Sequence, residues 1–134
     1  MNQVVVGIIS RETRRGIEYL LLSSKRDFGK FTGFYYPPGG HLENGENEEN
    51  ALVREIKEEL RIKVKPINKV AETSSDIKGQ LTHWWMCQAD TSKIKIQTDE
   101  IKNLRWFTRE EIIKSKNIWP ATKNIFQKYI FDKS

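Results

Sequence analysis

Three glutamates in one short segment are the side chains of this sequence best suited to bind a metal ion. The segment Asn47–Leu60 is rich in Glu, Leu and Ala and contains neither Gly nor Pro, which predicts a helix. At about 100° per residue, Glu58 and Glu59 lie about 60° and about 40° to either side of Glu55, so the three carboxylates share one face. Oxygen ligands favour a hard cation, Mg²⁺ first and Mn²⁺ second. For the helix alone, a solvated acidic face is the alternative interpretation.

The surrounding residues favour a site for a metal ion and a phosphate group. An apolar stripe beside the glutamates would dock the helix on a sheet; it consists of Leu52, Val53, Ile56 and Leu60. The upstream pair Gly39-Gly40 permits a tight turn with exposed carbonyl groups. Arg54 is placed either to pair with Glu58, four residues on, or to reach back to Glu46. A glycine turn, a positioned arginine and clustered carboxylates together indicate chemistry on phosphates.

The charge distribution points in the same direction. The net charge is +5 and the sequence pI is about 9.3. The stretch from Glu43 to Glu59 nevertheless holds seven acidic residues and two basic ones. An acidic segment in a basic protein indicates a cation site that faces an anionic ligand. The alternative is a lysine-rich, solvated surface with one acidic helix, and the scattered lysines form no known nucleic-acid-binding motif.

The composition limits the class of protein. With 134 residues, 37% of them hydrophobic and 31% charged, the chain suits one globular domain rather than a disordered, collagen-like or coiled-coil protein. No apolar run approaches the roughly 20 residues that span a bilayer, and we expect no secretion signal and no membrane partner. The single cysteine, Cys87, excludes an internal disulfide and a multi-cysteine zinc site. A cytoplasmic location is therefore expected; the sequence does not indicate an oligomeric state.

Strand-like and helix-like segments are mixed along the chain, which predicts the α/β class with a mixed sheet covered by helices. The expected strands are Val4–Ser10, Ile17–Ser24, Phe34–Tyr36, Lys63–Thr73, Gln80–Ala89 and Asn103–Phe107, with turns at Thr13–Gly16 and Asp76–Gly79 and a loop at Lys25–Gly33. We expect Pro37–Gly40 to end any strand there. Thr108 suits the N-cap of a helix to about Ser115, and Pro120 suits the first turn of a last helix, Trp119–Tyr129.

The acidic segment resembles the Nudix box, GX5EX7REUXEEXGU, in which U is a bulky aliphatic residue. The match runs from Gly40 through Glu46 to the stretch Arg54–Ile62, and Arg61 stands where the box has Gly. More loosely, the resemblance extends over most of the chain and implies a single Nudix hydrolase domain over residues 1–134. It implies an α/β/α sandwich around a mixed sheet. It also implies Mg²⁺-dependent cleavage of a nucleoside diphosphate linked to another group.

The resemblance also implies roles for particular residues. Glu55, Glu58 and Glu59 would bind the metal, together with the carbonyl group of Gly39. Arg54 and Glu46 would hold these glutamates in place, and Arg54 would thereby support catalysis. At Arg61, either the helix ends differently or arginine accepts a left-handed conformation that costs about 1 kcal/mol.

A further acidic residue and a basic one complete the expected phosphate end. Glu100 lies six residues before Trp106, as a glutamate does in MutT-like members, and is a candidate metal ligand or base. The base that activates water stays open among Glu58, Glu59 and Glu100. Arg26 is placed like an arginine that contacts phosphates in some members; the alternatives are Lys25 and Lys30.

The expected ligand is a nucleotide or another small molecule linked to a nucleoside diphosphate. Some relatives that cleave ADP-ribose or dinucleoside polyphosphates carry Pro or Tyr about 16 residues beyond the box, and neither occurs between Asp76 and Gln80. Nucleoside triphosphates, cleaved to a monophosphate and pyrophosphate, are then the first candidate. Trp119 is a candidate for base stacking, and Thr122 stands where MutT-like enzymes place a base-reading Asn. The alternatives are the two substrates above, an RNA 5′ end, and a nucleotide sensor without activity.

Overall fold

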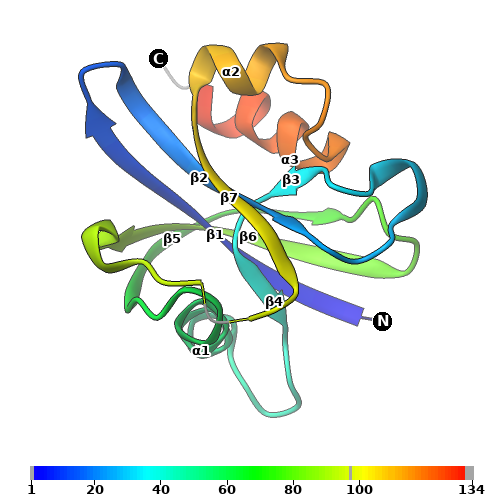
Figure 1. Cartoon of the computed structure of the whole chain (residues 1–134). Helices are drawn as coiled ribbons and strands as arrows, with labels where there is room; N and C mark the ends of the chain where they lie inside the picture. The colour runs from blue at the N-terminus through cyan, green and yellow to red at the C-terminus, as the bar shows by residue number, and fades with distance from the viewer. Residues whose placement is uncertain (1, 97, 132–134) are drawn as a thin grey trace.

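The computed structural model describes residues 2–96 and 98–131 (Figure 1). Within these residues the chain forms seven strands and three α-helices. The strands are β1 (Asn2–Thr13), β2 (Gly16–Ser24), β3 (Tyr35–Tyr36), β4 (Gly39–His41), β5 (Val64–Ser74), β6 (Gln80–Ala89) and β7 (Ile101–Thr108). The helices are α1 (Glu48–Leu60), α2 (Arg109–Lys114) and α3 (Pro120–Ile125), with short 3₁₀ turns η1 (Gly29–Phe31) and η2 (Thr91–Lys93) and a π-helical end, η3 (Phe126–Phe131).

The strands form one mixed sheet in the order β3-β2-β1-β6-β5, with β4 beside β1 and β7 beside β2. The β1–β6 pair is parallel, whereas β1–β2, β1–β4, β2–β3, β2–β7 and β5–β6 are antiparallel. The expected hairpins at 13–16 and 76–79 are present. The predicted mixed sheet is therefore confirmed.

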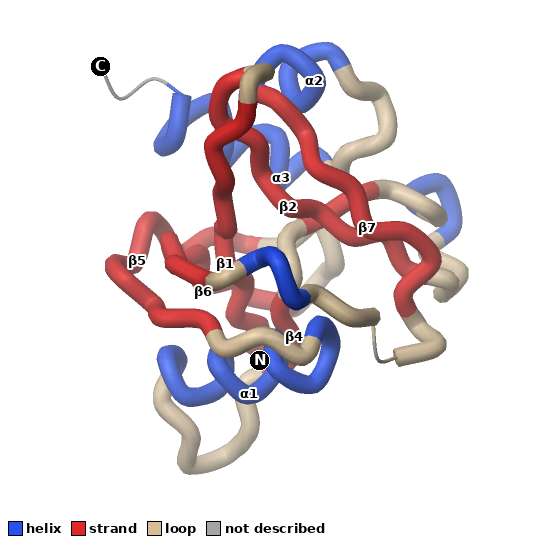
Figure 2. Tube along the Cα trace, turned by 60° about the vertical axis from the view of Figure 1, so that its left-hand side comes forward, coloured by secondary structure: helices blue, strands red, loops and turns tan. Residues whose placement is uncertain are grey.

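Alternate residues of the central strands pack on opposite faces of the sheet, as the twofold period of a strand requires. Val5 and Ile9 of β1 pack against α1, whereas Val6 and Ile8 pack against α2, α3 and η3. Figures 1 and 2 show α1 on one side of the strands and α2 and α3 on the other. The architecture is thus the α/β/α sandwich expected from the sequence, and it places the acidic helix alone on its face.

Strand β3 ends at Tyr36, before Pro37, as expected, but a strand that the sequence did not predict begins within the same segment. Gly39–His41 forms β4, which pairs with β1 through Val6 and Gly39. A Cβ atom on Gly39 would lie 2.0 Å from the carbonyl oxygen of Val5. Because Gly39 has no side chain, this segment can come close enough to β1 to pair with it, although proline and glycine are poor strand formers.

The last helix also differs from its predicted form. Pro120 lies in the first turn, as expected, but Trp119 is the N-cap rather than part of the helix. Helix α3 ends at Ile125, and η3 continues to Phe131 with wider π-helical turns. The expected loop 25–33 contains η1. Thr108 caps α2 as predicted. Among the helices described here, none is both long enough and apolar enough to cross a membrane.

Helix α1 ends in a strained residue. Arg61 has φ 58° and ψ 26°, the left-handed conformation, and its N–H donates to the carbonyl oxygen of Lys57 at 3.0 Å. Among the described residues it is the one non-glycine residue with positive φ. Of the two endings the sequence allowed, the chain adopts the one in which arginine accepts the strain.

Replacing Arg61 by Gly should therefore stabilise the protein. We expect Arg61→Gly to raise the free energy of unfolding by about 1 kcal/mol, because the relieved strain exceeds the extra chain entropy that glycine gains on unfolding. Urea denaturation measures this difference. Arg61→Ala is the matched control, since alanine keeps the strain; a gain of equal size in that variant would contradict the explanation.

Candidate metal and nucleotide site

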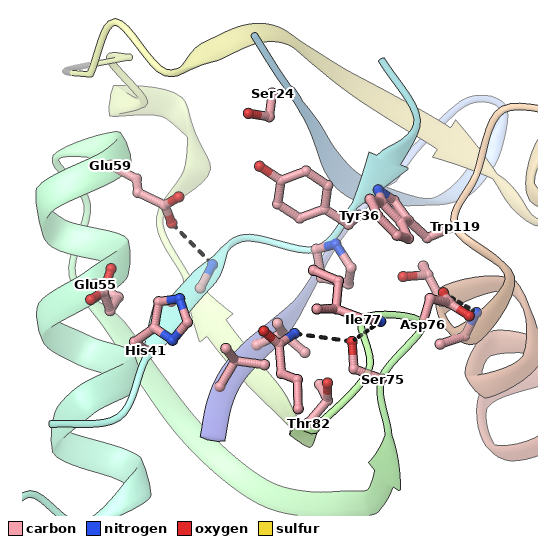
Figure 3. A pocket seen from close by; sticks show the side chains of 18 of the residues that line it. Ser24, Tyr36, His41, Glu55, Glu59, Ser75, Asp76, Ile77, Thr82 and Trp119 are labelled. Carbon is pink, nitrogen blue, oxygen red and sulfur yellow. Dashed lines mark hydrogen bonds between the residues drawn. The ribbon is translucent and has the colours of Figure 1, made fainter. Parts of the chain in front are cut away.

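A cavity of about 580 Å³ brings together residues from distant parts of the chain. Figure 3 shows Glu55 and Glu59 at one end of it, Trp119 at the other, and Tyr36 between them. Its walls contain the predicted metal ligands Gly39, Glu55, Glu58, Glu59 and Glu100 and the predicted substrate residues Arg26, Trp119 and Thr122. The two predicted supports, Glu46 and Arg54, do not line it. The predicted metal ligands and substrate residues therefore line one cavity, although they lie between Arg26 and Thr122, nearly a hundred residues apart in the chain.

Glu59 is one of two partly buried carboxylates of the cluster, with Glu55. Its Oε1 atom accepts a hydrogen bond from the N–H of Gly39 at 3.0 Å (Figure 3). Burial raises the pKa of Glu59 to about 8, and the negative charges of Glu55, Glu100 and Glu58 add to the shift. A cation beside these groups would restore the charged form, so this carboxylate suits a metal ligand.

Glu55 lies against the glycine turn. A Cβ atom on Gly40 would be 2.2 Å from Glu55 Oε2, so only glycine leaves this carboxylate in its place. Burial raises the pKa of Glu55, although Arg54 opposes the shift by donating from Nη1 to Oε1 at 2.9 Å. The glycine at position 40 therefore serves the site by its small size.

Arg54 forms ion pairs with Glu46, Glu55 and Glu58 without lining the cavity itself. Its Nε and Nη2 atoms donate to the two oxygens of Glu46, each at 2.8 Å, and Nη2 also donates to the carbonyl oxygen of His41 at 3.2 Å. Its Nη1 atom lies 3.5 Å from Glu58 Oε2. The hydrogen bonds from Arg54 lower the pKa of Glu46. Both partners allowed by the sequence are thus present, and the bidentate pair with Glu46 is the closer one.

The other two acidic residues are more accessible. The side chain of Glu58 is 61% exposed, and it projects from α1 beside Glu55 and Glu59 at the cavity wall. Glu100 precedes β7, and its carbonyl oxygen accepts a hydrogen bond from Lys25 N at 2.7 Å. Four acidic residues and Gly39 therefore line one cavity, and their oxygen atoms are of the kind that Mg²⁺ or Mn²⁺ prefers. Within the described residues, no three of these carboxylates place ligand atoms within 4.8 Å of one another.

A second group of possible ligands lies elsewhere and is already neutralised. Glu48, Glu72 and His83 place ligand atoms within 4.8 Å of one another. Lys69 Nζ lies 3.1 Å from Glu48 Oε1, 2.8 Å from Glu72 Oε1 and 2.9 Å from His83 Nδ1. The ammonium group takes the position that a metal ion would need, so this cluster is a salt-bridge network.

Beyond the acidic end, the cavity is lined by residues that the sequence analysis did not predict. Tyr36 lies between the acidic end and Trp119, and burial, with the charge of Glu59, raises its pKa to about 12. Phe28 follows Arg26 in the loop before η1 and lines the cavity as well. The turn between β5 and β6 adds Asp76, whose Oδ2 accepts from the N–H of Ala121 at 2.9 Å. A turn sequence gives no indication that it will meet a helix 45 residues away.

A model of the NUDIX domain matches residues 1–129 of the chain. The chain belongs to the Nudix family. The residues that carried the resemblance, Gly40 to Ile62, thus lie within a match that extends over almost the whole sequence.

Curated relatives include longer proteins. The NAD-capped RNA hydrolase NudC of Pseudomonas putida KT2440 is 33% identical over 98 residues, which cover 73% of this chain and 34% of that protein. The human NAD-capped RNA hydrolase NUDT12 is 34% identical over 84 residues, 58% of this chain and 18% of that protein. The chain thus spans about a third or less of these relatives.

Solved structures agree on the fold. The MutT NUDIX hydrolase of Burkholderia pseudomallei has a TM-score of 0.77 at 21% identity, covering 94% of this chain and 95% of that one. The Ap4A hydrolase of C. elegans has a TM-score of 0.75 at 21% identity, covering 95% and 93%. The Nudix fold therefore extends over nearly all of the chain.

Gly40→Ala should weaken metal binding, because the added methyl group occupies the place of the Glu55 carboxylate. We expect the affinity for Mn²⁺, measured by isothermal titration calorimetry, to fall about tenfold or more. Lys57→Ala, on the exposed side of α1, is the control and should bind as the original protein does. Equal affinities for the Gly40→Ala protein and the original would contradict the role of this glycine.

Metal binding should release a proton from Glu59. With a pKa of about 8, this carboxyl is mostly protonated at pH 7 in the metal-free protein, whereas a metal ligand is charged. We expect close to one proton released per Mg²⁺ bound at pH 7, and apparent affinity that rises about tenfold per pH unit until about pH 8. Calorimetry in buffers of different ionisation enthalpy measures the proton count.

Glu59→Gln is the control for this titration and should abolish the proton release. The stability of the metal-free protein gives a second check. Because the folded pKa of Glu59 is raised, its stabilising contribution is full below pH about 4.5 and is lost as the pH rises to about 8. Glu59→Gln should therefore gain stability relative to the original protein between these values; a parallel pH dependence of the two proteins would contradict the shift.

Proposed function

We propose that the chain is a Mg²⁺-dependent hydrolase that cleaves a diphosphate bond in a nucleotide substrate. One observation carries the proposal: a single cavity is lined by four glutamates and by Arg26, Phe28 and Trp119, and Figure 3 shows Glu55 and Glu59 at one end of it and Trp119 at the other. A nucleotide also has two different ends: its phosphates bind cations, and its base packs against aromatic rings. The cavity therefore fits both parts of such a substrate at once.

In this proposal the acidic end binds the metal and the metal supplies an activated water and charge neutralisation. Glu55, Glu58, Glu59 and the Gly39 carbonyl group would hold the ion, and Arg54 with Glu46 would keep the carboxylates in position. Glu58, Glu59 and Glu100 remain the candidates for the base. Among them, the exposed Glu58 and Glu100 have the freer access to a water molecule.

The first candidate substrate is a nucleoside triphosphate, cleaved to a monophosphate and pyrophosphate, as in MutT-like enzymes. A second candidate is an NAD-type dinucleotide, because the relatives at 33–34% identity are NAD-capped RNA hydrolases. ATP and NAD share an adenosine diphosphate unit, and we propose that this unit occupies the cavity. Because the chain spans only 34% of NudC, activity on NAD-capped RNA requires its own test.

A substrate panel with Mg²⁺ decides among these functions. We expect phosphate-bond cleavage of ATP or NAD, detected by chromatography of the products, with kcat reduced about a hundredfold or more in Glu58→Gln. Lys57→Gln, the neighbour on the exposed side of α1, should retain full activity. The panel should also contain ADP-ribose, a dinucleoside polyphosphate and 5′-triphosphorylated RNA.

Other outcomes of the panel identify the alternatives. Tight nucleotide binding without turnover would instead identify a sensor. Activity confined to triphosphorylated RNA, with a steep decrease at high salt, would identify an RNA 5′-end hydrolase. Equal activity of Glu58→Gln and the original protein would overturn the assignment of the site.

A further inference from the structure

The indole N–H of Trp119 is a buried donor without a partner. Trp119 is 8% exposed, and within the described residues its Nε1 atom has no hydrogen-bond partner. Trp84 and Trp85 differ, because their Nε1 atoms donate to Thr73 Oγ1 and Glu48 Oε1, each at 2.9 Å. Buried donors are satisfied in nearly all folded proteins, so an unpartnered one needs an explanation.

The backbone holds this side chain firmly at the cavity. Trp119 N donates to the carbonyl oxygen of Tyr35 at 3.1 Å, and Tyr35 N donates to that of Asn117 at 2.8 Å. Ile118 thereby forms a parallel bridge to Tyr35 in the sheet. Figure 3 shows the nitrogen-bearing edge of the Trp119 ring on the side of Tyr36, toward the cavity that both residues line.

Two aromatic side chains already pack against the Trp119 ring. Phe31 packs on the indole with ring centroids 4.7 Å apart and an angle of 36° between the planes. Phe28 makes an edge-to-face contact at 5.3 Å and 78°. These contacts already give the ring the aromatic partners that a nucleobase would supply. What Trp119 still offers to a ligand is its polar edge.

We propose that Trp119 recognises the adenine of the substrate by donating a hydrogen bond from Nε1 to a ring nitrogen of the base. This inference rests on the proposed function, which places an adenosine diphosphate unit in the cavity. It replaces the stacking role that the sequence predicted for Trp119 with a specific acceptor requirement. A base without an acceptor at that position leaves the donor buried and unsatisfied, so it binds more weakly.

Access to the donor requires a side-chain displacement. The Nε1 atom is closed off from solvent, so an adenine can reach it only when a neighbouring side chain moves. Phe28 is the neighbour suited to this, because it lies on the loop before η1 rather than in the sheet and is only partly buried. Arg26, whose guanidinium group lies 5.4 Å from the Phe28 ring centroid, belongs to the same loop.

Adenine analogues test the acceptor requirement. Calorimetry with AMP and with its 1-deaza, 3-deaza and 7-deaza forms, in the presence of Mg²⁺, compares ligands that each lack one ring nitrogen. We expect the original protein to bind one of the three analogues about fivefold to tenfold more weakly than AMP, the value of one lost hydrogen bond. Trp119→Phe should bind AMP more weakly by the same factor and all four ligands within twofold of one another.

Trp84→Phe is the matched control. Trp84 also lines the cavity, but its N–H is already used by Thr73, so this variant should keep the discrimination among the analogues. If the original protein binds AMP and the three analogues equally, or if Trp119→Phe discriminates as the original does, the inference is wrong. Failure of AMP to bind the original protein would also overturn it.

A measurement on the unchanged protein avoids any folding defect of the variant. The four tryptophans give separate indole N–H signals in a ¹⁵N-correlation spectrum. Saturation with AMP should move the Trp119 signal downfield, as a new hydrogen bond requires, and an unmoved signal would refute the contact. Because AMP binding needs no turnover, these results stand whether or not the substrate panel shows hydrolysis, so the two proposals can fail separately.

Discussion

The structure depends on holding several negative charges close together at the edge of the core. Two carboxylates about 6 Å apart repel each other by roughly 3 kcal/mol when they are partly shielded from water, so such a cluster needs fixed compensation. The chain supplies it with Arg54, which contacts Glu46, Glu55 and Glu58. Burial, followed by the charges of Glu55, Glu100 and Glu58, nevertheless raises the pKa of Glu59 to about 8. In the proposed function a bound cation would offset this remaining cost and restore the charged form of the carboxylate.

The parts that could be predicted from the sequence are those that local rules govern. The phase of α1 follows from residue spacing, and its buried side chains are Ala51, Leu52, Ile56 and Leu60. The cap at Thr108 and the β1–β2 hairpin likewise depend on neighbouring residues. Glu55, Glu58 and Glu59 line one cavity because a single helix carries all three, and their role as metal ligands stays a prediction.

What could not be predicted depends on distant contacts. The strand Gly39–His41 forms only because β1 lies beside it, and strand preferences alone argue against it. The aromatic contacts of Trp119 come from Phe28 and Phe31, some ninety residues earlier in the chain, and they decide whether its ring can stack on a ligand. The residues next to Trp119 in the sequence do not indicate these distant contacts, whereas the residues of the acidic helix directly give its charge and spacing.

The hydrogen bond between Asp76 and the first turn of α3 has a consequence for how this scaffold can diversify. It ties the turn between β5 and β6 to the C-terminal segment, so that two segments far apart in the chain together form one wall of the cavity. Mutations in that wall can alter ligand preference while the acidic helix stays untouched. Evolution, or an engineer who exchanges this hairpin, can thus change which ligand binds and leave the acidic residues of α1 in place.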